Sequence, residues 1–394
     1  MKVDIFDTIK RVLNVARREC GILVMNPIYA SCMVVFPLLV VFFFTDIMHE
    51  GQPQEMPIGV VDLDNTSTTR ALVRKLDGFQ TSHVVGYYNN VEEARRAIQR
   101  NKIYAFMYFP KGTTDELLAS RQPKISFYYS GTSLTAGALL FRDLKTMSVL
   151  GSAAVGQATM RAKGFSDMQI QAFMQPIVVD LHPLNNPWIN YNMYLSTMLI
   201  PGILLLFIFL ITPYSIGTEL KFKTNKELMR ISKGDILVAM VGKFLPQFFI
   251  FLTIMYIYMW YVFGHLGFPH PGGAGRLIAL GFLSVLASQS FGIFVFGLMP
   301  SLRMSMSLCS LWGVLSFTTG GFTFPVFAMD GAIEAIAQLF PLRHYYMIYQ
   351  KCIFNGYPLH IAWFNIMALG ILIALPFFVL GKLRKALTEY VYIP

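Results

Sequence analysis

Six long apolar segments limit the folds open to this chain more than any other feature of its sequence. A helix needs about 20 consecutive apolar residues to cross the hydrocarbon core of a bilayer, and each segment is long enough. Only 14% of the 394 residues are charged, against about 25% in soluble globular proteins. The sequence therefore predicts an α-helical polytopic membrane protein with six transmembrane helices. The predicted spans cover roughly residues 27–45, 191–216, 244–263, 277–300, 305–325 and 361–380.

Residues 47–190, between the first two spans, have the size of one soluble domain. Short β-rich runs alternate there with helical patterns, which is typical of a small α/β domain. A long helical stretch rich in Ala and Gly follows over 132–163, and Ser166 with Gln169 forms a capping-box pattern that begins a shorter helix. The β-rich runs are 57–64, 83–88, 103–109 and 124–130, and the helical patterns are 69–79, 91–101 and 115–120.

Residues 4–25 form an amphipathic pattern with a basic polar face. Such a helix directly before a span is typical of a segment that lies in the inner membrane interface. A surface helix of a cytosolic domain has the same pattern, so both interpretations stay open. The apolar face carries Ile5, Ile9, Val12, Leu13, Ala16 and Leu23, and the polar face carries Asp7, Lys10, Arg11, Asn14, Arg17 and Arg18.

The distribution of Lys and Arg predicts the orientation in the membrane. Fifteen of them lie before the first span, in the loop 217–243, at Arg303 or in the C-terminal tail, whereas three lie in the other short loops. Cytoplasmic loops are enriched in Lys and Arg, and long loops are exempt from this bias. We therefore expect both termini in the cytoplasm and the soluble domain outside, so the net charge of +10 reflects orientation rather than nucleic-acid binding. The chain divides into an interfacial helix (1–26), a first span (27–46), an extracytoplasmic α/β plus helical domain (47–190), the remaining spans (191–381) and a tail (382–394).

Motifs of common nucleotide-binding, metal-binding and hydrolytic sites are absent from the sequence. No G-x-x-x-x-G-K-[ST] occurs, because the two Gly-Lys pairs are followed by Phe244 and Leu383. H-E-x-x-H and G-x-S-x-G are absent too, and the four cysteines have no metal-site spacing. We therefore expect the chain to bind no metal or cofactor and to have no catalytic residues.

Charged side chains are missing from the middle of every predicted span. Ion-coupled secondary transporters usually place carboxylates there, so their absence argues against self-powered transport. Three polar residues remain as candidates for a substrate path, although hydrogen bonding between helices is the more common role of such residues. They are Asn192, Gln247 and Gln289.

The stretch 217–243 combines a charged helix end, a short helical run near 226–231, a Gly-containing turn and a return helix that begins near Asp235. Basic, helical cytoplasmic loops are common, but the motifs of this one resemble the loop between the second and third spans of ABC type-2 exporter permeases. Ile231-Ser232 stands where that family usually has Thr-Pro. The matching residues are Gly217, Thr218, Glu219, Glu227, Leu228, Met229, Ser232, Ile236, Leu237, Gly242, Lys243, Phe244, Leu245 and Pro246.

A second match to this family covers residues 320–356, at the end of the fifth predicted span and after it, and includes most of an expected outer hairpin over 325–360. The pattern is apolar on one side and broken at Pro325 and Pro341, which indicates an outer-leaflet hairpin of short helices. Asp330 stands where the family has a second proline. The matching residues are Gly321, Phe322, Pro325, Met329, Pro341, Leu342, Tyr345 and Gly356.

A third match lies in the soluble domain, after its first β-rich run. By itself, a cluster of Asp, Asn, Thr and Ser residues between a strand and a helix indicates only a turn and a helix N-cap. Permeases of the branch with a large domain after the first span are similar at this place, so the resemblance covers almost the whole chain. The matching residues are Val61, Asp62, Asp64, Ser67, Thr69 and Arg70.

The resemblance implies half of a transporter. Two permease chains, the same or sisters, would flank the path, and a cytoplasmic ABC ATPase dimer with ATP and Mg would supply the energy. It also implies a bacterial inner-membrane exporter of hydrophobic or amphipathic compounds, such as drugs or lipids, with a periplasmic adaptor and an outer-membrane channel as outer partners. Residues expected to couple to the ATPase are Thr218, Glu219, Lys226, Glu227, Leu228, Arg230, Ser232 and Lys233, and those of the outer hairpin are Gly321, Phe322, Pro325, Pro341 and Tyr345.

Two other classes of membrane protein are rivals to a permease. A membrane scaffold or receptor would use the external domain to bind a partner without transporting anything. An intramembrane enzyme is disfavoured, because no nucleophile–base pair or metal cluster falls in the spans. Recovery of a stoichiometric ATPase with the chain would separate the permease from the scaffold.

Overall fold

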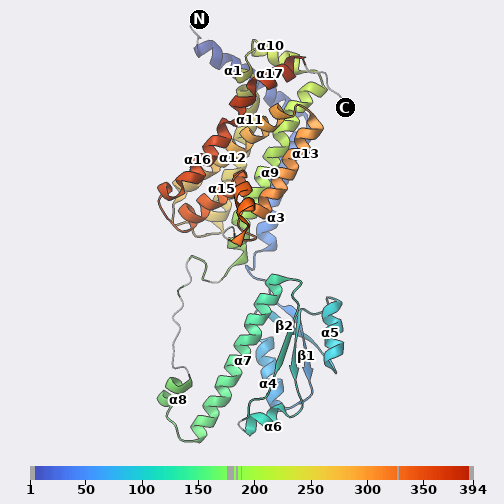
Figure 1. The fold of residues 1–394 in the computed structure, drawn as a ribbon, viewed down its shortest axis with the longest axis vertical. Helices are drawn as coiled ribbons and strands as arrows, with labels where there is room; N and C mark the ends of the chain where they lie inside the picture. Colours follow the sequence, from blue (N-terminus) through green and yellow to red (C-terminus); the bar gives the residue numbers. More distant parts are fainter. Residues whose placement is uncertain are drawn as a thin grey trace. The chain divides into compact units, whose positions relative to one another are not determined.

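The computed structural model describes residues 5–119, 121–174, 182, 185–187, 189–325 and 328–389. The chain forms two compact units. One contains Met1–His49 and Leu184–Pro394 and is helical, and the other is Glu50–Pro183 and contains the sheet (Figure 1).

Among the described residues, five helical segments of the first unit are long and apolar enough to cross a membrane. Three of the predicted spans lie within α9, α11 with η2, and the last segment, and the first coincides with the segment from α2 to α3. The predicted span 277–300 lies mostly within α12, which ends at Leu298. These segments are Pro27–Ile47, Tyr191–Lys221, Ile236–His265, Ala274–Leu298 and Leu359–Glu389. Their elements are α2 (Pro27–Ala30), η1 (Ser31–Val35), α3 (Phe36–Ile47), α9 (Tyr191–Lys221), α11 (Ile236–Met259), η2 (Trp260–His265), α12 (Ala274–Leu298), η5 (Leu359–Ala362), α16 (Trp363–Ala374), η6 (Leu375–Val379) and α17 (Leu380–Glu389).

The remaining predicted span, 305–325, corresponds to the shorter helix α13 (Leu302–Thr319), which packs against α9. Arg303 and several serines lower its hydropathy, and it is not among the five helices that meet the length and composition of a span. The described residues therefore contain five helical segments that could span a membrane, and the sixth span stays a prediction.

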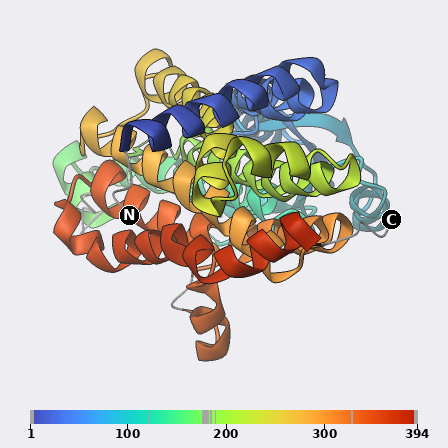
Figure 2. The ribbon, with the colours of Figure 1, turned by 90° about the horizontal axis from the view of Figure 1, so that it is seen from above.

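Shorter helices cover both ends of this bundle. The amphipathic helix predicted over 4–25 is observed as α1, and Figure 2 shows it side-on in dark blue. In the predicted hairpin, α15 begins at Pro341, whose fixed φ suits the first turn of a helix. Both α15 and the following π-helical turn are largely buried in the core of the unit. These elements are α1 (Ile5–Met25), α10 (Asn225–Ile231), α14 (Gly331–Ala337), α15 (Pro341–Ile348) and η4 (Tyr349–Phe354).

The second unit is a small α/β domain, as its alternating pattern predicts. Its strands are ordered β2-β1-β3-β4, with β1 parallel to β2 and β3 and the edge strand β4 antiparallel to β3. Helices α4 and α7 share one apolar cluster with the sheet, and α5 shares the cluster on the other face (Figure 1). The elements are β1 (Met56–Asp62), α4 (Ser67–Asp77), β2 (Ser82–Tyr87), α5 (Val91–Gln99), β3 (Ala105–Phe109), α6 (Thr113–Leu118), β4 (Ser126–Tyr129), α7 (Leu134–Ala162) and α8 (Asp167–Met174).

The acidic turn after β1 is held by hydrogen bonds within the unit. Asp64 accepts hydrogen bonds from the backbone N–H of Gly112 at 2.8 Å and from the hydroxyl of Thr114 at 2.6 Å. The hydrogen bonds from Thr114 lower the pKa of Asp64 below its ordinary value, although partial burial opposes them. Asp62 accepts from Thr69, and Thr66 caps α4. This motif therefore joins the β1–α4 turn to the β3–α6 turn.

Candidate functional site

Helix α1 packs closely against the first turns of α11. Val15 is fully buried, and a Cβ atom added at Gly242 would lie 2.6 Å from the Cβ of Val15. Only a glycine lets two backbones approach this far without displacing one of them. The close packing places the polar side chains of α1 beside those of α9 and α11.

Arg18 of α1 binds two helices at once. Its guanidinium donates to both carboxylate oxygens of Glu219 on α9, at 2.8 and 3.0 Å, and to Glu227 on α10 at 3.2 Å. Bidentate pairing of this kind is the strongest geometry between arginine and a carboxylate. Burial alone would lower the pKa of Arg18, but the two carboxylates outweigh it and raise the pKa above its ordinary value.

Lys243 of α11 completes a buried network beneath Arg18. Its ammonium group donates to Glu19 of α1 and to Glu219, each at 2.8 Å, and its side chain is only 1% exposed. Glu19 also accepts from Gln247 at 3.0 Å and from Ser215 at 3.2 Å. An isolated charge is costly to bury, so each of these groups depends on the others. We call Arg18, Glu19, Glu219, Glu227 and Lys243 the charged junction.

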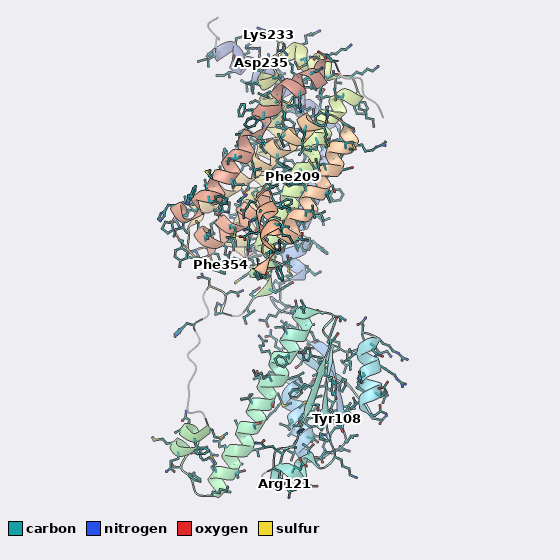
Figure 3. The ribbon with its side chains drawn as sticks, in the orientation of Figure 1. Tyr108, Arg121, Phe209, Lys233, Asp235 and Phe354 are labelled. Atoms are coloured by element: carbon teal, nitrogen blue, oxygen red, sulfur yellow. The ribbon has the colours of Figure 1, made fainter. Side chains whose placement is uncertain are left out.

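Two further contacts attach α1 and the C-terminal helix to the same end of the unit. Lys233, in the turn between α10 and α11, donates to Asp7 at 3.1 and 3.2 Å. This hydrogen bond lowers the pKa of Asp7, and burial opposes it weakly. Asn225 of α10 donates to the backbone carbonyl of Leu387 in α17 at 2.6 Å. Figure 3 labels Lys233 and Asp235 at this turn, at the opposite end of the helical unit from Phe354.

The predicted coupling residues divide into exposed and buried groups. Glu219, Leu228 and Ser232 are almost completely buried, so they do not face a partner in this conformation. Thr218 is partly buried, and its hydroxyl lies 3.4 Å from that of Tyr29. The exposed members of the set are Lys226, Glu227, Arg230 and Lys233.

Residues 28–382 match the model of the family described as ABC-2 family transporter protein. This match covers most of the sequence. The chain belongs to the ABC-2 family of transporter proteins. No curated protein matches the sequence significantly. With its long apolar helices, the chain is a multi-pass membrane permease of an ABC system, in which an ATPase partner is implied by the family.

The three candidate path residues of the permease are all buried and hydrogen-bonded. Asn192 donates to the carbonyl of Thr45 at 3.2 Å, which links α9 to α3. Gln247 of α11 donates to Glu19 of the charged junction at 3.0 Å. Gln289 donates to the carbonyl of Phe244 at 3.2 Å and lines an apolar pocket of about 340 Å³. Each therefore makes a contact between helices, and Gln289 also faces an open space.

The predicted outer-hairpin residues of the permease lie at different depths. Phe322, Pro341 and Tyr345 are buried in the main core of the helical unit or at its edge. Gly321 has a φ of 96°, which a residue with a side chain rarely adopts. Pro325 is exposed, directly before residues that lie outside the described part of the chain.

Sequence reasoning missed two members of the junction. It placed Arg18 on the polar face of α1 and did not single out Glu19, and it treated Lys243 only as part of a motif. One signal was available. Glu19 follows Val15 and precedes Leu23 by four residues, so it lies on the face that α1 buries. A carboxylate on a buried face requires a cationic partner, and Lys243 at the edge of a predicted span is suited to that role.

Proposed function

We propose that this permease is a subunit of an ATP-driven exporter and that α10 receives the motion of a cytoplasmic ATPase dimer. The charged junction is the observation that carries the proposal. It links Glu227, an exposed side chain of α10, to Arg18 of α1. Arg18 is joined in turn to α9 and α11 through the buried ion pairs of Glu219 with Arg18 and Lys243. When α10 is displaced, these contacts would move α1, α9 and α11 with it. The family membership supports an ATPase partner.

The same end of the helical unit would face the cytoplasm, with both termini. The excess of Lys and Arg in its loops supports this orientation. Helix α1 also leaves a row of apolar side chains exposed, and such a row suits the inner membrane interface. The row consists of Ile5, Phe6, Ile9 and Leu13. The α/β unit would then lie outside the cytoplasm, where a periplasmic adaptor and an outer-membrane channel could meet it.

A second permease chain, the same or a sister, would complete the transport path. Helix α13 would be the sixth span, and its outward face carries polar side chains among exposed apolar ones such as Met304, Leu311 and Val314. Arg303, Ser307 and Thr318 lie on that face at helical spacing and are exposed. A neighbouring chain that encloses a partly hydrated path would solvate them. The cargo would be hydrophobic or amphipathic, because the pocket beside Gln289 is lined mainly by apolar side chains.

Co-purification with the ATPase tests the proposed function. We expect Lys226→Glu with Arg230→Glu to reduce recovery of the ATPase by about tenfold, because both cations are exposed on α10 and reversal turns attraction into repulsion. Lys382→Glu with Arg384→Glu, which also reverses two exposed cations but on α17, is the matched control and should leave recovery unchanged.

Transport of a fluorescent amphiphile into inverted vesicles should fall with ATPase recovery. If the permease never recovers an ATPase, or the α10 variants recover and transport as the control does, the proposal is wrong. A chain that binds an external partner without any ATPase would instead be the scaffold or receptor considered above.

A further inference from the structure

The α/β unit contains a large groove that the proposed coupling mechanism does not use. It lies among α4, α6, β4, α7 and α8 and has a volume of about 1480 Å³. Arg121, which Figure 3 labels beside α6, lines it. Pockets for drug-sized ligands are usually about 300–1,000 Å³. The groove is therefore large enough for a lipid-sized molecule.

The groove exists because α7 is longer than the sheet that it covers. Its first half buries Leu140, Leu144 and Met147 against the sheet. Its second half carries small residues, including Gly151 and Ala154, and does not fill the space beside α4 and β4. Helix α8 folds back onto this half, where a Cβ atom at Gly156 would lie 3.0 Å from the methyl group of Met174.

Apolar side chains form the inner surface of the groove. Met107 of β3 and Met147 of α7 are almost completely buried at its base. Leu72, Phe127 and Val155 are partly buried around them. Methionine adapts its shape easily, so such a surface accommodates flexible alkyl chains of different lengths.

The charged residues that line the groove are all cations. They are exposed, and none of them forms an ion pair within the described residues, while no acidic side chain lines the groove. These cations are Lys75, Arg121, Lys124 and Lys163. An apolar base below unpaired cations is complementary to a molecule with alkyl chains and an anionic headgroup.

We propose that this groove is a binding site for an anionic amphiphile with at least one long alkyl chain. The alkyl chain lies against the methionines, and the headgroup lies among the cations. Such a molecule is the cargo class that the external unit accepts from the membrane helices. This last step rests on the proposed export function, whereas binding to the groove does not.

Fluorescence titration of the full-length protein in phosphatidylcholine nanodiscs tests the headgroup site. The probes are dansyl-undecanoate and its uncharged methyl ester, with empty nanodiscs subtracted. We expect Arg121→Glu with Lys124→Glu to weaken binding of the anion by about tenfold and to leave the ester unchanged. Arg95→Glu with Arg100→Glu, on and directly after α5 at the other face of the sheet, should stay within about twofold of the parent.

A tryptophan pair on α7 tests the alkyl site. Ala154 lines the groove and Gln157 does not, although both are exposed on the same helix. We expect Ala154→Trp to weaken binding of both probes and Gln157→Trp to weaken neither. Unchanged binding in the charge-reversed and Ala154→Trp variants would overturn the groove as the site. Equal affinity of anion and ester in the parent would overturn the anionic ligand.

The two proposals fail separately. If no ATPase co-purifies, the export function is wrong, and so is the assignment of the ligand as cargo. The nanodisc titration still tests whether the groove binds an anionic amphiphile. If the groove variants bind the probes with unchanged affinity, the groove is not the binding site. Co-purification of the ATPase still tests the proposed function.

Discussion

The two units of this protein use charge in opposite ways. The helical unit buries Lys243 between Glu19 and Glu219, two carboxylates from helices far apart in the sequence. The α/β unit leaves Arg121 and Lys124 exposed around a groove. Buried pairs hold helices in fixed positions because separation would leave a charge without a partner. Unpaired exposed cations remain free for a ligand.

The largest effect should come from removing the cation at the centre of the junction. Lys243→Met leaves Glu19 and Glu219 buried without it, which is expected to cost about 3–5 kcal/mol of stability. Unfolding of the permease in detergent, followed by circular dichroism, measures the change. Lys221→Met, at the exposed end of α9, should cost less than about 0.5 kcal/mol. Equal effects of the two variants would show that the junction does not hold the helices.

A smaller effect should follow from separating α1 from α11 without touching a charge. Gly242→Leu places side-chain atoms where Val15 already lies, and such overpacking costs about 1–3 kcal/mol. Gly21→Leu is the control, since a Cβ atom there meets nothing within 4 Å. Hydrogen exchange of α1 should increase in the Gly242 variant and not in the Gly21 variant. Unchanged exchange in both would contradict the role of the glycine in placing Arg18 and Glu19.

The smallest effect should come from the acidic turn of the α/β unit, where charge acts locally. Asp64→Asn weakens the hydrogen bonds from Gly112 and Thr114, at a cost of about 1 kcal/mol. Because folding lowers the pKa of Asp64, its contribution is complete above the unfolded pKa of about 3.9 and is lost as pH falls through the lower folded value. Hydrogen exchange of α6 should therefore differ between parent and variant at pH 7 more than in acid. A difference independent of pH would contradict this account.

Local structure was largely predictable from the sequence. The short helix expected near 226–231 is α10 (Asn225–Ile231), and the return helix expected near Asp235 has that residue as its N-cap. The capping box at Ser166 and the alternation of strands and helices in the α/β unit are confirmed as well. These features depend on neighbours a few residues apart, so a single sequence contains the information that they need.

The burial of Lys243 shows where local reasoning stops. The return helix expected near Asp235 is observed as α11, but the sequence alone did not indicate that the lysine within it is buried. A lone lysine is unfavourable in an apolar helix, and only the presence of Glu19 and Glu219 makes its burial acceptable. Those partners are distant in the sequence, so hydropathy could not reveal them.

The sequence by itself determined a helical membrane protein, the position of its α/β unit in the chain and a resemblance to ABC type-2 permeases, because length, apolarity and short motifs are local properties. Only the tertiary structure decided which charges are hidden and which are available. Glu219 is a buried contact whose partners are Arg18 and Lys243, and Glu19 is the second carboxylate bound to Lys243. The second half of α7 leaves a groove open. Pairing and packing depend on residues brought together across the chain, and folding alone sets those distances.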